Sequence, residues 1–295
     1  MYSQIAANKR KTVLLIAVFL IIIWSLGYFF GWYFDLGYTP LIMAFGLSII
    51  MSLFGYYRGD SLALTLAGAQ PITKEQNAYV YRLVENLCIT AGLPTPKIYL
   101  INDSALNAFA TGRDPEHASI ALTTGIVKAL ANEELEGVIA HELSHVKNLD
   151  IRVMTIVIVC VGIVTLLTDI MLRGHFWGGG RRSDSRQAGA ILMIIGLVLA
   201  ILAPLFARLI QFAVSRQREF LADASSALLT RYPEGLARAL EKISVNPAVS
   251  HYNRALSHLY ISEPKPLGSR LTSLFSTHPP IAERVQRLRQ MERSA

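Results

Sequence analysis

The sequence predicts a mainly α-helical integral membrane protein, with four transmembrane helices, that carries a small α+β domain. Hydrophobic residues make up 52% of the chain and charged residues only 17%, whereas charged residues make up about 25% of an ordinary soluble domain. Four apolar stretches reach the roughly 20 residues that a helix needs to cross a bilayer. The segments between and after these stretches are amphipathic, as in a globular domain.

Two of the predicted transmembrane helices lie near the N-terminus, from about Thr12 to Phe34 and from about Tyr38 to Tyr57. The other two run from about Val153 to Leu172 and from about Ala190 to Ile210. A basic segment such as Lys9–Lys11 also precedes the apolar region of secretory signal peptides. The first stretch is too long for such a peptide, however, and lacks a small-residue cleavage site, so we interpret it as an uncleaved anchor.

The segment between the second and third apolar stretches predicts a helix, three short strands and a second helix. A capping-box pattern at Thr73–Gln76 opens the first helix, and Gly92 ends it. Asn132 is the expected N-cap of the second helix, which has no breaker before the third apolar stretch and is therefore free to continue into the membrane. After the fourth stretch the chain is helical again, and a basic helix begins at about Pro280. The strands are expected at residues 97–101, 106–111 and 119–123.

The strongest chemical motif is His141-Glu142-Leu143-Ser144-His145. On a helix, residues i and i+4 lie on one face, so the two imidazoles could bind one zinc ion. Glu142 could then take a proton from water whose pKa the zinc lowers toward ~7. Seven histidines in the chain make an accidental match rare but possible. A catalytic zinc also needs a third protein ligand, which must come from elsewhere in the chain.

Glu219 is the candidate for that third ligand, and Asp223 follows it by four residues. Both side chains would lie on one helix face, so that Glu219 could bind the metal while Asp223 hydrogen-bonds the far nitrogen of a ligand imidazole. Alone, such a pair is more typical of a solvated face with salt bridges to neighbouring arginines. Two membrane crossings separate it from His141, however, and two crossings return the chain to the same side at the same depth.

HExxH with a downstream ExxxD is the gluzincin pattern, and SRQREFLADA, NAFATG and the order of the apolar stretches resemble the HtpX family of bacterial membrane proteases. That family is related to the CAAX prenyl proteases of eukaryotes. The resemblance implies that the small α+β domain is a gluzincin-like metalloprotease domain with one Zn²⁺ per chain. It assigns His141, His145 and Glu219 as ligands, Glu142 as the general base and Asp223 as a support for a ligand.

Two further sites follow from the resemblance. Residues Asn107, Ala108, Phe109 and Ala110 match a NAFA segment that would form an edge strand and bind the substrate backbone by strand addition. His278 and Arg284 match a C-terminal His-Pro motif whose groups would stabilise the oxyanion of the tetrahedral intermediate. From the residues alone, an ordinary edge strand and a loop histidine explain these segments as well.

The basic segment Lys9–Lys11 predicts a cytoplasmic N-terminus. The chain then divides into a transmembrane hairpin (1–57), the first part of a catalytic domain (58–150), a second transmembrane hairpin (151–214) and the second part of that domain (215–295). This places the active site on the cytoplasmic face of the bacterial inner (plasma) membrane, in a multi-pass protein. Four arginines in the loop of the second hairpin disagree with an outside position, so whether that hairpin crosses fully stays open.

The expected reaction is the hydrolysis of peptide bonds. The resemblance implies quality control under stress, with unfolded or damaged membrane proteins as substrates and cooperation with other membrane quality-control proteases. We attribute the net charge of +7 to contact with the headgroups of the lipid bilayer, which is the expected partner, and no nucleic acid is expected to bind. Two alternatives remain: a site-two protease, whose HExxH would lie inside an apolar stretch, and a non-enzymatic membrane scaffold with a structural metal, for which Glu142 would have no use.

Overall fold

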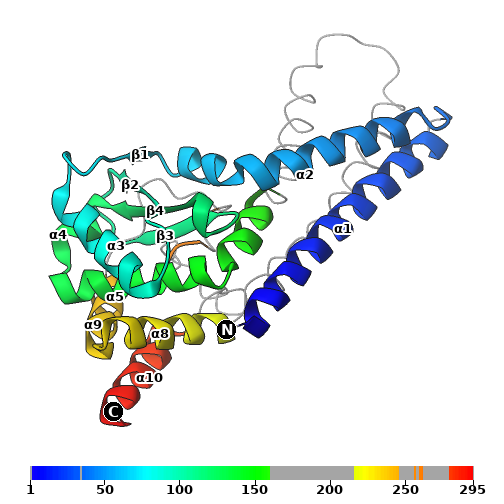
Figure 1. Ribbon diagram of the computed structural model, residues 1–295. Coiled ribbons are helices and arrows are strands. Elements are labelled where there is room, and N and C mark those ends of the chain that lie inside the picture. Colours follow the sequence, from blue (N-terminus) through cyan, green and yellow to red (C-terminus); the bar gives the residue numbers. More distant parts are fainter. Residues whose placement is uncertain are drawn as a thin grey trace.

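The computed structural model describes residues 2–33, 35–159, 216–245, 256, 259–261 and 279–294. Within these residues the chain is mainly helical and contains one four-stranded sheet. Helices α1 and α2 form a long hairpin that projects from a globular part holding the sheet and the other helices (Figure 1). The third predicted transmembrane helix is described only as far as Val159, and the fourth lies outside the described residues, as does His278.

Helices α1 (Tyr2–Tyr33) and α2 (Thr39–Leu66) cover the first two predicted spans, although α1 begins before the first span and α2 ends after the second. Both contain segments, from Gln4 and from Thr39, that are long and apolar enough to cross a membrane. Their large apolar side chains point outward, as shown by Trp32, which is 73% exposed. Such exposure is unfavourable in water and suits contact with lipid. Two membrane helices are thus supported, whereas four are not tested by the described residues.

Glycines on α2 allow the start of the third predicted span to pack closely against it. The chain is helical over residues 150–159, and Gly59 and Gly55 face Thr155 and Val159 on that helix. A Cβ atom on Gly59 would lie 2.6 Å from Thr155 Cγ2, and one on Gly55 would lie 2.8 Å from Val159 Cγ1. Because these distances are far below van der Waals contact, the small-xxx-small spacing is what permits the two helices to approach.

The sheet has the order β1-β2-β4-β3, in which β2 and β4 are parallel and the other pairs are antiparallel. Strand β3 is therefore at an edge. The three predicted strands are confirmed to within two residues, whereas β1 was missed because its three residues, with a proline, carry little strand pattern. The strands are β1 (Ala69–Pro71), β2 (Lys97–Ile101), β3 (Ala108–Gly112) and β4 (Ala118–Thr123).

Alternate residues of β3 enter two different cores, as the two-residue period of a strand requires. Ala108 and Ala110 point into the larger core, which α3 (Ala78–Ala91) and α5 (Asn132–Lys147) help to form. Phe109 points to the opposite face, where the end of α2 and residues 256 and 259–260 pack against the sheet. The sheet is thus covered on both faces, and β3 brings its outer edge next to α5.

The start of α3 differs from the prediction. The Gln76 side chain accepts a hydrogen bond from the Thr73 N–H, but this closes a turn, and Asn77 is the N-cap of the helix. The Asn77 side chain accepts from the Val80 N–H and so satisfies a donor that the capping-box residues were expected to satisfy. The predicted stop is confirmed, because Gly92 has the left-handed backbone (φ 66°) that favours glycine.

Helix α5 begins at Asn132, but its N-cap is Ala131 and not Asn132 as predicted, because the Ala131 N–H donates to the Glu134 side chain one turn later. The helix also does not continue into the third span. The chain turns at Asn148 and Leu149, where Leu149 has a φ of 59°, and a new helix begins at Asp150. A left-handed residue other than glycine is disfavoured and persists only where surrounding contacts fix it. Here Leu149 is buried, and the Asn148 carbonyl accepts a hydrogen bond from Asn8 of α1.

Helices α8 (Arg216–Thr230) and α9 (Pro233–Ser244) pack against α5, and α10 (Ile281–Ser294) packs against α8 and α9 (Figure 1). Helix α8 lies along α5, and α9 contacts both α5 and α10. The last of these confirms the predicted basic helix near Pro280. The remaining elements are η1 (Pro115–His117) and α4 (Thr124–Ala129).

Candidate metal centre

Helices α5 and α8 bring the three predicted metal ligands together. His141 and His145 lie one turn apart on α5, and their Nε2 atoms are 3.2 Å apart. The carboxylate of Glu219 on α8 lies 3.7 Å from each of these nitrogens, through Oε2 to His141 and through Oε1 to His145. All three side chains are buried. The predicted approach of Glu219 to the HExxH motif is thus seen in the structure, whereas the two membrane crossings predicted between them stay a prediction.

The distances fit a tetrahedral zinc site. Zinc binds nitrogen and oxygen ligands at about 2.0–2.1 Å, which places the ligand atoms of a tetrahedron roughly 3.3 Å apart. The observed separations of 3.2, 3.7 and 3.7 Å lie close to that value. Two imidazoles and one carboxylate would occupy three corners and leave the fourth for water or substrate, as in catalytic zinc sites.

The charge of the surrounding cluster also fits a divalent cation. Four buried carboxylates and two buried guanidinium groups give a formal charge of −2 when both imidazoles are neutral. A buried excess of negative charge is unfavourable unless a cation compensates it. A divalent ion would compensate this buried negative charge. The carboxylates are those of Glu142, Asp150, Glu219 and Asp223, and the guanidinium groups are those of Arg218 and Arg284.

The pKa values follow the same electrostatics. Burial alone would lower the pKa of His145, but its contact with Asp150 and the charge of Glu219 raise it to about 9. Burial raises the pKa of Glu142, and the two imidazoles offset only part of this effect. Burial also opposes ionisation of Asp223, but the Arg284 guanidinium outweighs it and holds the pKa at about 2. The cluster thus favours positive charge at the His145 imidazole and keeps Asp223 ionised.

Each imidazole has a carboxylate at its other ring nitrogen. His141 Nδ1 lies 3.0 Å from Asp223 Oδ1, and His145 Nδ1 lies 3.0 Å from Asp150 Oδ2. A carboxylate there holds the proton on Nδ1 and leaves the Nε2 lone pair for a metal. Asp223 was predicted to support a ligand in this way. Asp150 was missed, because it lies five residues after His145 and a continuous helix would turn it about 140° away.

The outer edge of β3 runs beside the site. Asn107 and Phe109 turn their backbone groups toward β4, so those of Ala108 and Ala110 point outward. The Ala110 N–H donates to Glu142 Oε2 at 2.9 Å, and the Ala108 carbonyl accepts from the Ile261 N–H at 3.1 Å. The Asn107–Ala110 segment therefore forms an edge next to the HExxH helix. Its binding of substrate stays a prediction.

Arg284 on α10 is buried beside this cluster. Its Nε and Nη2 donate to the two oxygens of Asp223 at 2.9 and 2.7 Å, and its Nη1 donates to the Ile261 carbonyl at 3.2 Å. The structure thus gives Arg284 a role as the partner of Asp223. Its predicted action on the oxyanion stays a prediction, as does that of His278, which lies outside the described residues.

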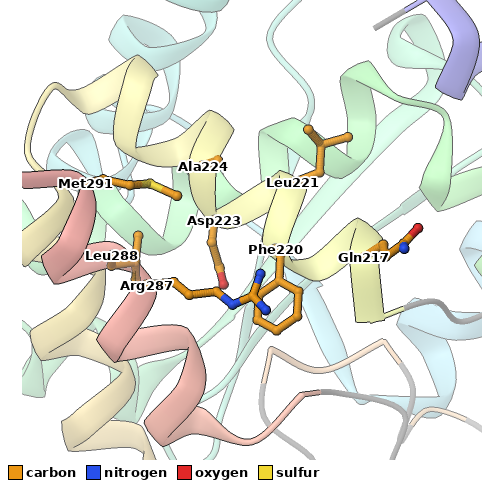
Figure 2. Close-up of a pocket in the computed structure, with 8 residues that line it drawn as sticks. All are labelled: Gln217, Phe220, Leu221, Asp223, Ala224, Arg287, Leu288 and Met291. Atoms are coloured by element: carbon orange, nitrogen blue, oxygen red, sulfur yellow. The ribbon is translucent and has the colours of Figure 1, made fainter. Parts of the chain in front are cut away.

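A pocket of about 360 Å³ lies between α8 and α10 (Figure 2). Arg287 lies over the ring of Phe220 there, with its guanidinium carbon 3.7 Å from the ring centroid. Asp223 borders the pocket and is its link to the metal centre. Because the proposed substrate edge is β3 and the pocket is lined from α8 and α10, we do not expect it to hold the reacting peptide bond.

Comparisons with known proteins agree with this geometry. The model of Peptidase family M48 matches residues 74–292. Two relatives described as "Protease HtpX homolog" come from Thermoanaerobacter pseudethanolicus and Dictyoglomus thermophilum. The first is 45% identical over 99% of this chain and 98% of its own length, and the second is 46% identical over 98% and 94%.

The crystal structure of S. mikatae Ste24p has a similar fold, with a TM-score of 0.51 and 20% identity over 98% of this chain and 67% of that chain. The resemblance to the HtpX family is thus confirmed over nearly the whole chain. The family establishes a membrane metalloprotease that uses a metal cofactor. On these grounds the chain belongs to Peptidase family M48.

Proposed function

We propose that this protein is a zinc-dependent membrane endopeptidase. His141, His145 and Glu219 hold the zinc, and Glu142 is the general base. The observation that carries the proposal is the set of three buried ligand side chains at tetrahedral spacing, with the buried carboxylate of Glu142 on the helix of the two histidines. Zinc held by such a set supplies Lewis acidity, which polarises a peptide carbonyl and makes water more acidic.

Glu142 moves the protons of the reaction. In its ionised form it takes a proton from the attacking water, and it later donates this proton to the leaving amine. Its buried position raises the pKa of the carboxyl group, which brings it closer to the neutral range in which a general base both accepts and returns a proton. The hydrogen bond from the Ala110 N–H holds one of its oxygens in place between α5 and β3.

The substrate is proposed to be an extended chain that lies along β3. The Ala108 carbonyl and the Ala110 N–H point away from β4, on the side where an added strand would pair. A substrate strand would have to replace the bond from the Ile261 N–H to the Ala108 carbonyl, whereas the Ala110 N–H donates to Glu142. Strand addition recognises the backbone, which suits unfolded or damaged membrane proteins of varied sequence. Quality control under stress, in cooperation with other membrane proteases, is the role that the resemblance to the HtpX family implies.

The active site is proposed to face the cytoplasm from the bacterial inner membrane. Asn8, near the beginning of α1, contacts Asp150 of the metal centre. The centre therefore lies at the N-terminal end of the membrane hairpin, beside the basic segment Lys9–Lys11. Because basic segments stay on the cytoplasmic side, this contact favours a cytoplasmic site independently of the number of later crossings.

The test compares cleavage of casein by the detergent-purified wild-type protein and by Glu142→Gln, with the zinc content of each determined. We expect about one zinc per chain in both and cleavage by the wild type alone. Glu133→Gln, the same change at an exposed position of α5, is the control and should cleave like the wild type. Zinc binding without cleavage by any of the three would instead support the scaffold.

A further inference from the structure

Asn8 is a buried polar residue on the membrane hairpin. It lies in α1, it is 1% exposed, and its Nδ2 donates to the Asn148 carbonyl at 2.8 Å and to Asp150 Oδ1 at 2.7 Å. Both partners are acceptors, so the reversed amide would place oxygen against oxygen, and the orientation of the side chain is determined. The membrane hairpin thus reaches the metal centre through two hydrogen bonds from one side chain.

Asp150 connects Asn8 to a metal ligand. Its Oδ1 accepts from Asn8 and from Arg218 Nη1, the latter at 3.2 Å, while its Oδ2 lies 3.0 Å from His145 Nδ1. The two carboxylate oxygens of Asp150 therefore make different contacts. One is fixed by donors from α1 and α8, and the other is thereby directed at the imidazole.

The break in the helix after α5 is needed for this arrangement, and Asn8 binds both the break itself and the carboxylate that follows it. A continuous helix would turn Asp150 about 140° away from His145, whereas the left-handed Leu149 returns it to the same side. Asn8 binds the carbonyl of Asn148, the first residue of the break, and the carboxylate that the break positions. Through these two bonds Asn8 holds both the break and the Asp150 carboxylate in place.

We propose that Asn8 is a positioning residue for the metal centre. It acts through Asp150 to fix the tautomer and direction of the His145 imidazole, so that packing of the N-terminal membrane helix sets the affinity of the site for zinc. The inference rests on the proposed function only in taking His145 as a ligand. It goes further because it makes the membrane anchor part of the metal-binding machinery.

The experiment measures the dissociation constant for zinc, by competition with a chelator, on the full-length protein in detergent. Asn8→Leu removes both hydrogen bonds and is expected to weaken zinc binding about 10-fold, the lower end of the effect of losing such a support. Gln4→Leu is the matched control, because Gln4 is an amide one turn earlier on the same helix face. It should bind zinc like the wild type.

A double-mutant cycle separates positioning from general stabilisation. If Asn8 acts through Asp150, then Asn8→Leu weakens zinc binding in the wild type but has little further effect in an Asp150→Asn background. A residue that only holds α1 in place would lower the thermal unfolding midpoint of the metal-free protein and leave the zinc constant unchanged. That result, or full additivity of the two changes, overturns the proposal.

Three further outcomes are informative. If Asn8→Leu does not fold, Asn8→Ala removes the same donors without added bulk and takes its place in the cycle. If the wild type itself binds no zinc, the proposed function fails together with this inference. Zinc binding by the wild type with no effect of either Asn8 variant overturns the inference alone.

Discussion

The two imidazoles of the metal centre are supported in the same way but from opposite ends of the chain. His141 faces Asp223, which Arg284 of the last helix holds with two hydrogen bonds. His145 faces Asp150, whose other oxygen accepts from Asn8 of the first helix. Both supports consist of a carboxylate oriented by a donor from a distant helix. The supports of the metal centre thus come from both ends of the chain.

The two supports lead to different parts of the molecule. On the His141 side, Arg284 also donates to the Ile261 carbonyl, and the Ile261 N–H donates to Ala108 at the edge of β3. On the His145 side, the network ends in the membrane hairpin. We infer that one ligand is coupled to the proposed substrate edge and the other to the membrane anchor, so the two supports can be tested separately.

The largest expected effect comes from removing the guanidinium on the His141 side. Arg284→Ala leaves Asp223 as a buried carboxylate without its cation, which we expect to lower the free energy of unfolding by about 3–5 kcal/mol. Arg218→Ala makes the same change on the His145 side but leaves Asn8 on Asp150, so the expected loss is about 1–3 kcal/mol. Denaturant titration of the detergent-purified protein measures both. Equal losses would show that Asn8 does not compensate for Arg218.

The two sides also differ in what the sequence could predict. Glu219 and Asp223 are four residues apart on one helix, so the helical period alone placed both on one face, and the resemblance assigned their roles. No helical period in the sequence relates Asp150 to His145 or to Asn8. Their contacts depend on a left-handed residue at position 149 and on a helix more than a hundred residues away. Local patterns predicted the elements and the ligands, whereas the tertiary support of His145 became visible only in the folded chain.

The second prediction concerns zinc affinity and compares the two carboxylates directly. Asp223→Asn and Asp150→Asn each weaken the control of an imidazole tautomer, and we expect each to raise the zinc dissociation constant by about 10- to 100-fold. The control is Asp60→Asn, an acidic position on α2, which should leave it unchanged. An effect at one carboxylate only would mean that the two supports are alike in geometry but not in function.

The third prediction tests the close packing between α2 and the helix that begins at Asp150, the residue that supports His145. Gly59→Ala would place a Cβ atom 2.6 Å from Thr155, on the helix that begins at Asp150. We expect a loss of about 1–2 kcal/mol in the free energy of unfolding, because overpacking exceeds the better helix propensity of alanine. Gly46→Ala on the same helix meets nothing within 4 Å and should be neutral or stabilising. Denaturant titration of both variants decides whether the close approach is required.

The smallest expected effect lies where the His141 side meets β3. Ile261→Pro removes the N–H that occupies the Ala108 carbonyl and keeps the carbonyl that Arg284 binds. If a substrate strand has to replace that bond, the change should lower KM for casein by about 2- to 10-fold, the equivalent of one net hydrogen bond, with little change in kcat.

Ile261→Val keeps the N–H and is the control for the altered side chain. A KM that stays at the wild-type value in Ile261→Pro would argue that substrate does not pair with the outer edge of β3 at Ala108. A lower KM in the proline variant alone would show that the chain's own segment competes for that edge. In that case Ile261 links substrate entry to Arg284, and through Asp223 to the His141 ligand, whereas the His145 side would remain unaffected.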